Sequence, residues 1–133
     1  MSTTRHQFTS KNAEDCSGER EGQAEIMART LRLIGDMWVL LIIYNLMSGT
    51  KRFGELLESL GNVSPKTLSQ RLKTLEEAQI VSRQAFAEIP PRVEYHLTAK
   101  GEALLKVLEA LQEFGMRYIA DEQVAIAKTH SET

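Results

Sequence analysis

The sequence predicts a mainly helical domain with one small β-hairpin, in the α+β class. Apolar residues recur at helical spacing along most of the chain, and they change to strict alternation near residues 81–97. The length agrees with one domain, because 133 residues can bury a single core of ordinary size. Hydrophobic residues make up 42% and charged residues 26%, the balance of a soluble globular protein.

Composition excludes several classes of protein. The longest apolar run is too short for a bilayer span, which needs ~20 residues, and the polar first residues do not read as a secretory signal. One cysteine forms no internal disulfide, so we expect a cytoplasmic protein. The net charge is −2, yet residues 48–100 carry eight Lys or Arg against six Asp or Glu. The positive charge is therefore concentrated in the middle of the chain.

We expect three segments: a flexible N-terminal arm at 1–22, the main domain at 23–127 and a frayed tail at 128–133. A helical pattern begins at Gln23, and Gly35 ends it. The next helix, Met37–Met47, is apolar nearly all round and is expected in the centre of the domain.

Two further helices follow around a tight turn. Phe53 opens a short amphipathic helix that ends at Gly61. Ser64 is then suited to cap a new helix, Pro65–Ala78, because serine accepts a bond from a first-turn amide and proline is tolerated at the first helical position. The apolar stripe of this helix is narrow and consists of Leu68, Leu72 and Leu75.

The alternating segments 81–86 and 93–97 predict two strands joined by a proline-containing loop. Thr98 can cap a final long helix with one apolar face. Two helices joined by a tight turn and followed by a hairpin describe a winged helix-turn-helix.

The outer face of Pro65–Ala78 carries the functional prediction, because a helix that enters the major groove needs polar and basic side chains that reach base edges. We predict base contacts from the first half of the helix, and phosphate contacts from its N-terminus, its flanks and the hairpin tip. The predicted DNA-binding residues are Arg52, Ser64, Lys66, Thr67, Gln70, Arg71, Lys73 and Arg92. A solvated amphipathic helix has the same pattern, and the acidic net charge favours an alternative, a winged-helix protein-interaction module without DNA binding.

Four motifs in order resemble the HxlR-type transcriptional regulators, from about Thr30 to Gly115. They are Leu31-Arg32-Leu33-Ile34-Gly35-Asp36-Met37-Trp38, Arg52-Phe53-Gly54-Glu55-Leu56, Ser64-Pro65-Lys66-Thr67-Leu68-Ser69-Gln70-Arg71-Leu72 and Pro90-Pro91-Arg92-Val93-Glu94-Tyr95-His96-Leu97-Thr98. The resemblance implies a prokaryotic DNA-binding homodimer related in fold to MarR-type repressors. It also implies that the helix matching Ser64–Leu75 reads the operator and that the hairpin matching Ile80–Thr98 is the wing.

The chain departs from that family at the position of its sensor cysteine. Many members carry a cysteine about thirteen residues before the motif tryptophan, where this chain has Glu25. Cys16 lies nine residues earlier, among acidic neighbours that raise a thiol pKa. Cys16 is therefore a possible redox sensor, and a passive residue of the arm is the alternative. A thiol enzyme that uses Cys16 is a third hypothesis, and it lacks a partnering base in any predicted element.

The last helix predicts a homodimer. Leu104, Leu111 and Tyr118 repeat every seven residues, which suits a seam with another helix. Phe114 lies between them, and Ile26 on the first helix is expected to help cover this surface from the other subunit. We therefore expect an inverted-repeat operator in double-stranded DNA.

No other chemistry stands out. The three histidines have no spacing that would join them to Cys16 in a metal site, and no catalytic or phosphate-binding motif is present. We expect no enzyme activity and no cofactor. Trp38, Phe53, Tyr95 and Phe114 are read as core residues, with a pocket for a small-molecule effector as the alternative.

Overall fold

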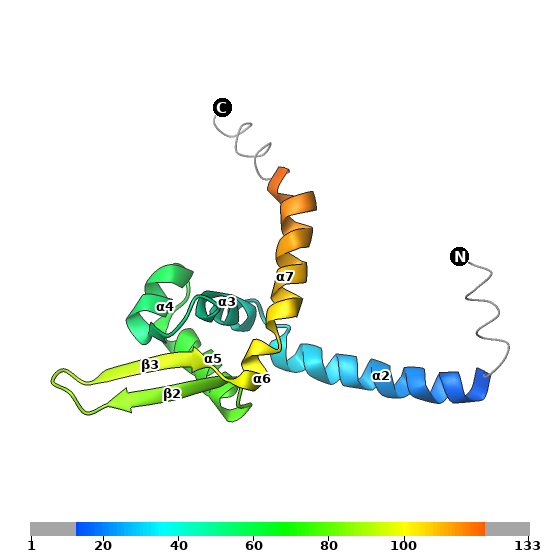
Figure 1. Cartoon of the computed structure of the whole chain (residues 1–133), viewed down its shortest axis with the longest axis horizontal. Coiled ribbons are helices and arrows are strands. Elements are labelled where there is room, and N and C mark those ends of the chain that lie inside the picture. Colours follow the sequence, from blue (N-terminus) through cyan, green and yellow to red (C-terminus); the bar gives the residue numbers. More distant parts are fainter. Residues whose placement is uncertain (1–12, 122–133) are drawn as a thin grey trace. The chain divides into compact units, whose positions relative to one another are not determined.

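The computed structural model describes residues 13–121 and divides the chain into two compact units, with the boundary after Asp36 (Figure 1). The first unit holds one long helix, and the second holds the remaining helices and the sheet. Each unit is described by itself below.

The first unit contains helix α2, Ala13–Ile34. Our prediction placed the start of this helix at Gln23, so residues 13–22 of the predicted flexible arm are helical instead, and residues 1–12 lie outside the described part. The prediction failed here because these residues have no apolar periodicity, although Ala, Glu and Arg favour helix by intrinsic propensity. Gly35 ends α2 as expected, with its N–H donating to the Leu31 carbonyl at 2.7 Å.

The second unit has the order predicted for a winged helix-turn-helix. Its elements are α3 (Met37–Leu46), β1 (Lys51–Arg52), α4 (Phe53–Leu60), α5 (Pro65–Glu77), β2 (Val81–Phe86), β3 (Arg92–Leu97), α6 (Ala99–Glu102), α7 (Leu105–Phe114) and the π-helical segment η1 (Gly115–Ile119). Figure 1 shows the β2–β3 hairpin extending away from the helices.

The sheet has three antiparallel strands in the order β1-β3-β2. The predicted β-hairpin is present, and its register runs from Val81 opposite Leu97 to Phe86 opposite Arg92. Strand β1 is an addition to the prediction, since a two-residue strand has no detectable period. It pairs Lys51 with Tyr95 and Arg52 with Glu94, and so joins the start of α4 to the middle strand.

The core of the second unit lies between α3, α4, α5 and the sheet. All three leucines of the narrow α5 stripe are fully buried, and they pack with residues of the other elements because apolar surface is stabilised when it leaves water. The fully buried side chains are those of Val39, Ile42, Ile43, Leu56, Leu68, Leu72, Leu75, Ile80 and Val81. The described residues contain no buried polar or charged side chain.

Helix α3 differs from the prediction on one side. We expected a helix covered on most sides, but Met37, Leu41 and Tyr44 are exposed, whereas the opposite face is buried. The reason is the size of the core: the second unit has too little material to cover more than one face of α3.

The predicted single C-terminal helix is interrupted. Thr98 caps its start as expected, with its hydroxyl accepting from the Gly101 N–H at 3.1 Å. The helix then divides into α6, α7 and η1. Lys100 Nζ donates to the Ala78 carbonyl at 2.8 Å, and the Thr98 N–H donates to the Ile80 carbonyl at 3.0 Å. These bonds tie the start of α6 to the end of α5.

Candidate nucleic-acid interface

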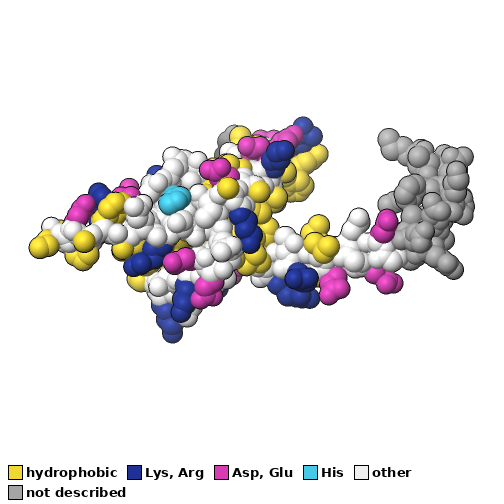
Figure 2. Space-filling model, turned by 60° about the horizontal axis from the view of Figure 1, so that its bottom comes forward, with side chains coloured by type: hydrophobic (Ala, Val, Ile, Leu, Met, Phe, Trp, Pro, Cys, Tyr) yellow, Lys and Arg dark blue, Asp and Glu magenta, His cyan; other side chains and the backbone are white. Residues whose placement is uncertain are grey.

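The outer face of α5 is polar and open to solvent. Lys66, Gln70 and Lys73 are exposed, and Thr67 and Arg71 are half-buried beside them. The helical spacing places Lys66, Gln70 and Lys73 on the side away from the buried leucines, and Thr67 and Arg71 on its flank. Figure 2 shows basic side chains interspersed with acidic ones on the face that it presents. The α5 surface can therefore offer donors to a polyanion without disturbing the core.

The N-terminus of α5 is organised by Ser64. Its hydroxyl accepts from the Thr67 N–H at 3.1 Å and donates to the Thr67 hydroxyl at 2.9 Å. Serine at this position satisfies an amide that the helix leaves without an intrahelical partner. Of the first three helical residues, Pro65 has no N–H and Thr67 is capped. A phosphate at this end would therefore meet the N–H of Lys66.

Arg52 lies in β1, immediately before α4. Its backbone N–H donates to Glu55 Oε1 at 2.8 Å, which fixes the first turn of α4. Its guanidinium Nε lies 3.9 Å from Glu94 Oε2 on β3. This ion pair is long and its arginine is exposed, so the side chain can be released to another anion at little cost.

Arg92 lies at the tip end of the hairpin, where it forms the last pair of the ladder with Phe86 beside the loop, but its side chain is engaged by neighbouring groups. It is the first residue of β3 and is half-buried. Its guanidinium lies 3.1 Å from Glu88 Oε1, 3.4 Å from Glu94 Oε2 and 4.1 Å above the centre of the Phe86 ring. The sequence carried no local signal for these three partners, because a spacing of four indicates an ion pair only on a helix, and Glu88 lies in the loop of a hairpin.

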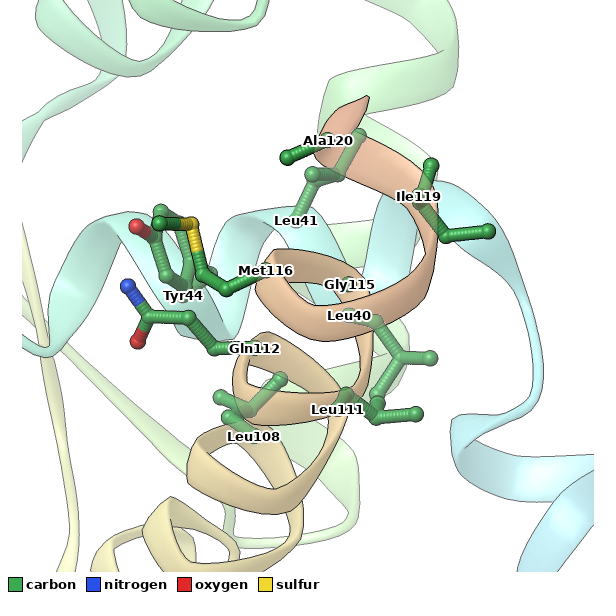
Figure 3. A pocket seen from close by; sticks show the side chains of 10 residues that line it. All are labelled: Leu40, Leu41, Tyr44, Leu108, Leu111, Gln112, Gly115, Met116, Ile119 and Ala120. Atoms are coloured by element: carbon green, nitrogen blue, oxygen red, sulfur yellow. The ribbon is translucent and has the colours of Figure 1, made fainter. Parts of the chain in front are cut away.

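A second, apolar surface lies between α3, α7 and η1. Its residues form a hollow of about 670 Å³ (Figure 3). The hollow is lined by Leu40, Leu41, Tyr44, Leu108, Leu111, Gln112, Gly115, Met116, Ile119 and Ala120. Apart from Gln112, the lining is apolar or amphipathic, so water gains few hydrogen bonds there.

The predicted dimerisation residues are mostly exposed within this chain. Leu111 is 51%, Phe114 57% and Tyr118 54% exposed, and the two aromatic rings lie 5.1 Å apart, whereas Leu104 is half-buried. The π-helical turn at η1 breaks the seven-residue repeat before Tyr118, because a π-turn inserts an extra residue into the helical phase. Ile26, in the first unit, is also exposed, together with Met27 and Leu31 of α2.

The structure says less about Cys16, metal ligands and membrane-spanning helices. Cys16 lies in α2, but its side chain is outside the described part. Across residues 13–121 no group of three or more His, Cys, Asp or Glu side chains is placed to hold a metal ion. No helix in that range is both long and apolar enough to cross a membrane.

Comparison with known proteins places this geometry in a family. Residues 33–123 match the family described as HxlR-like helix-turn-helix. An HTH-type transcriptional regulator of Synechocystis, sll1512, is 37% identical over 115 residues, which are 86% of this chain and 84% of the relative. The HTH-type transcriptional regulator YodB of Bacillus subtilis is 42% identical over 92 residues, which are 69% of this chain and 82% of YodB.

Solved structures agree with the sequence relatives. The reduced form of YodB from B. subtilis superposes with a TM-score of 0.62 at 41% identity, over 71% of this chain and 93% of that one. A MarR-family regulator from Porphyromonas gingivalis gives a TM-score of 0.68 at 32% identity, over 70% of this chain and 91% of that one. The predicted fold and family are therefore confirmed, and the chain belongs to the HxlR-like helix-turn-helix family of transcriptional regulators, with a MarR-like winged-helix fold.

Proposed function

We propose that this regulator binds a specific operator in double-stranded DNA as a homodimer, and that it controls transcription by occupying or leaving that operator. The observation that carries the proposal is the division of α5 into two faces. One face is a fully buried leucine stripe, and the other is an exposed polar and basic surface on the second helix of a helix-turn-helix. The second helix of this motif is the one that enters the major groove.

The base contacts in this proposal come from Thr67, Gln70 and Arg71. Glutamine pairs bidentately with adenine, and arginine with guanine. Lys66 and Lys73 supply phosphate contacts on either side, and Ser64 holds the helix N-terminus in place through its bonds to Thr67. Arg52 is exposed enough to add a further phosphate contact.

The homodimer is proposed from the apolar surface. A second copy that covers the exposed part of α7 and η1 would remove Leu111, Phe114 and Tyr118 from water, which is favourable at about 25 cal/mol for each Å² buried. The exposed apolar residues of α2, including Ile26, are the matching surface on the other subunit. A two-fold axis then requires an inverted-repeat operator, with half-sites about 10 base pairs apart or a multiple of that.

Regulation follows from the same arrangement. A signal acts on a DNA-binding dimer by favouring one spacing of the two recognition helices, because a ligand shifts only an equilibrium whose states it binds differently. The hollow between α3, α7 and η1 is the place where a small apolar effector would compete with the dimer contact. We place this activity in the cytoplasm, where a prokaryotic operator lies.

The test is selection of binding sites from random duplex DNA, followed by mobility shifts at several salt concentrations. We expect a symmetric site, nanomolar affinity and a steep loss of affinity with salt. Lys66→Gln and Lys73→Gln should each reduce the salt slope by about 0.9, while Glu109→Gln on α7 serves as a control for an altered surface charge. Failure to enrich any site would contradict DNA binding and favour the protein-interaction module.

A further inference from the structure

We define the wing as β2, β3 and the loop 87–91. Four alternating charges form a line from the tip of the wing along β3 to strand β1. Glu94 Oε2 lies 3.9 Å from Arg52 Nε and 3.4 Å from Arg92 Nε. Arg92 Nη2 in turn lies 3.1 Å from Glu88 Oε1 in the loop. The line therefore connects the loop of the wing, strand β3 and strand β1, which leads directly into α4.

The Phe86 ring closes the remaining side of Arg92. Phe86 and Arg92 are directly paired across β2 and β3, and the guanidinium carbon lies 4.1 Å from the ring centre. A guanidinium at that distance is attracted by the electrons of the ring. Arg92 is thus flanked by two carboxylates and covered on one face by an aromatic ring. Its buried Nε lies in ion-pair range of Glu94 without making a hydrogen bond.

This environment opposes a contact between Arg92 and DNA. Its side chain is 27% exposed and that of Glu94 is 24% exposed, so both charges are partly removed from water. To bind a phosphate, Arg92 would have to leave two carboxylates and a ring. The same carboxylates, Glu88 and Glu94, would also repel the incoming phosphate.

We propose that Arg92 and Glu94 are positioning residues, which hold the loop of the wing against strand β3, the strand that pairs with β1, and that Arg92 makes no contact with DNA. The inference rests on the proposed operator binding and replaces the phosphate or minor-groove contact that the sequence alone predicted for Arg92. The wing then reaches DNA in one orientation, set by the ion pairs, and other residues supply its contacts.

Two single variants distinguish a positioning role of Arg92 from a DNA contact. Glu94→Gln does so by the direction in which operator affinity changes, and Arg92→Gln by the salt dependence of that affinity. Glu94→Gln should weaken operator binding, because Arg92 loses a partner and the loop loosens. Arg92→Gln should weaken binding by the same factor at every salt concentration, so that the slope stays as in the parent protein. A phosphate-binding Arg92 would give the reverse: tighter binding in Glu94→Gln, where a competing carboxylate is gone, and a slope about 0.9 smaller in Arg92→Gln.

A double-mutant cycle tests the ion pair without DNA, and thus independently of the proposed function. Arg92→Gln, Glu94→Gln and the double variant, which introduce no like-charge contact with Glu88 or Arg52, are unfolded with urea. We expect the two single changes to be non-additive, with a coupling of about fivefold in the unfolding equilibrium constant. Glu109→Gln, an exposed carboxylate on α7, is the control. Additive effects on unfolding, or a Glu94→Gln protein that binds DNA more tightly, would overturn the proposal.

Discussion

Two helix faces in the second unit remain outside the core, and they differ in chemistry. The outer face of α5 carries lysine, glutamine and arginine, whereas the outer side of α3 and α7 carries leucine, tyrosine and phenylalanine. Water can form hydrogen bonds with the polar side chains of the first face. The second face exposes a contiguous apolar surface to water. Exposed apolar surface of this kind is typical of an interaction site. The difference between the two faces supports the proposal that one contacts DNA and the other a second copy of the chain.

The largest effect on operator binding should come from charged substitutions in the apolar face of α7 and η1. Replacing Phe114 and Tyr118 with Asp should give monomers, because two carboxylates would be buried in the proposed interface. The loss of the second half-site should weaken operator binding by about 10²–10⁴-fold. Sedimentation and mobility shifts measure both effects, and Ser59→Asp on α4 is the control. A dimeric double variant, or a monomer with full affinity, would contradict the assignment.

The next largest effect should come from a substitution on the buried side of α5, and it should appear in the free energy of unfolding. Leu72 is 1% exposed, so Leu72→Ala should lower the free energy of unfolding by about 2–5 kcal/mol through lost burial and a cavity. The neighbouring Lys73→Ala, on the exposed face, should change it by less than about 0.5 kcal/mol. Urea denaturation compares the two directly. Equal effects would mean that the two faces of α5 have been assigned wrongly.

The Arg71→Ala variant tests whether the polar face of α5 reads bases. If Arg71 pairs with guanine, its loss should cost about 1–3 kcal/mol of specific binding and relax the preference at one operator position. Affinities for the selected operator and for single-base variants measure this change. An unaltered preference at every position would remove Arg71 from the base-reading set.

The smallest effect is expected at Cys16. Cys16→Ser should leave operator binding, and its response to peroxide or quinones, as in the parent protein, because the acidic neighbours in the sequence disfavour a reactive thiolate. Mobility shifts before and after oxidant treatment provide the measurement. An oxidant response that disappears in the variant would show that Cys16 is a sensor.

The sequence determined the parts of the molecule whose signals are local. Ser64, Pro65 and the leucine stripe predicted the start and the buried face of α5, because capping and helical period depend on neighbours within a few residues. Alternation likewise predicted the two strands of the hairpin. The set of side chains on the outer face of α5 followed directly from that period.

Tertiary structure decided what depends on contacts between distant segments. Strand β1 is two residues long and exists because β3 supplies its partners some forty residues later in the chain. The same pairing brings Arg52 and Glu94 together, and with them Arg92, whose ion pairs at the tip of the hairpin the sequence alone did not show. The sequence also did not show that one side of α3 is exposed. The apolar residues of a helix indicate that it packs against other elements. How many of its sides are buried depends on the size of the core around it.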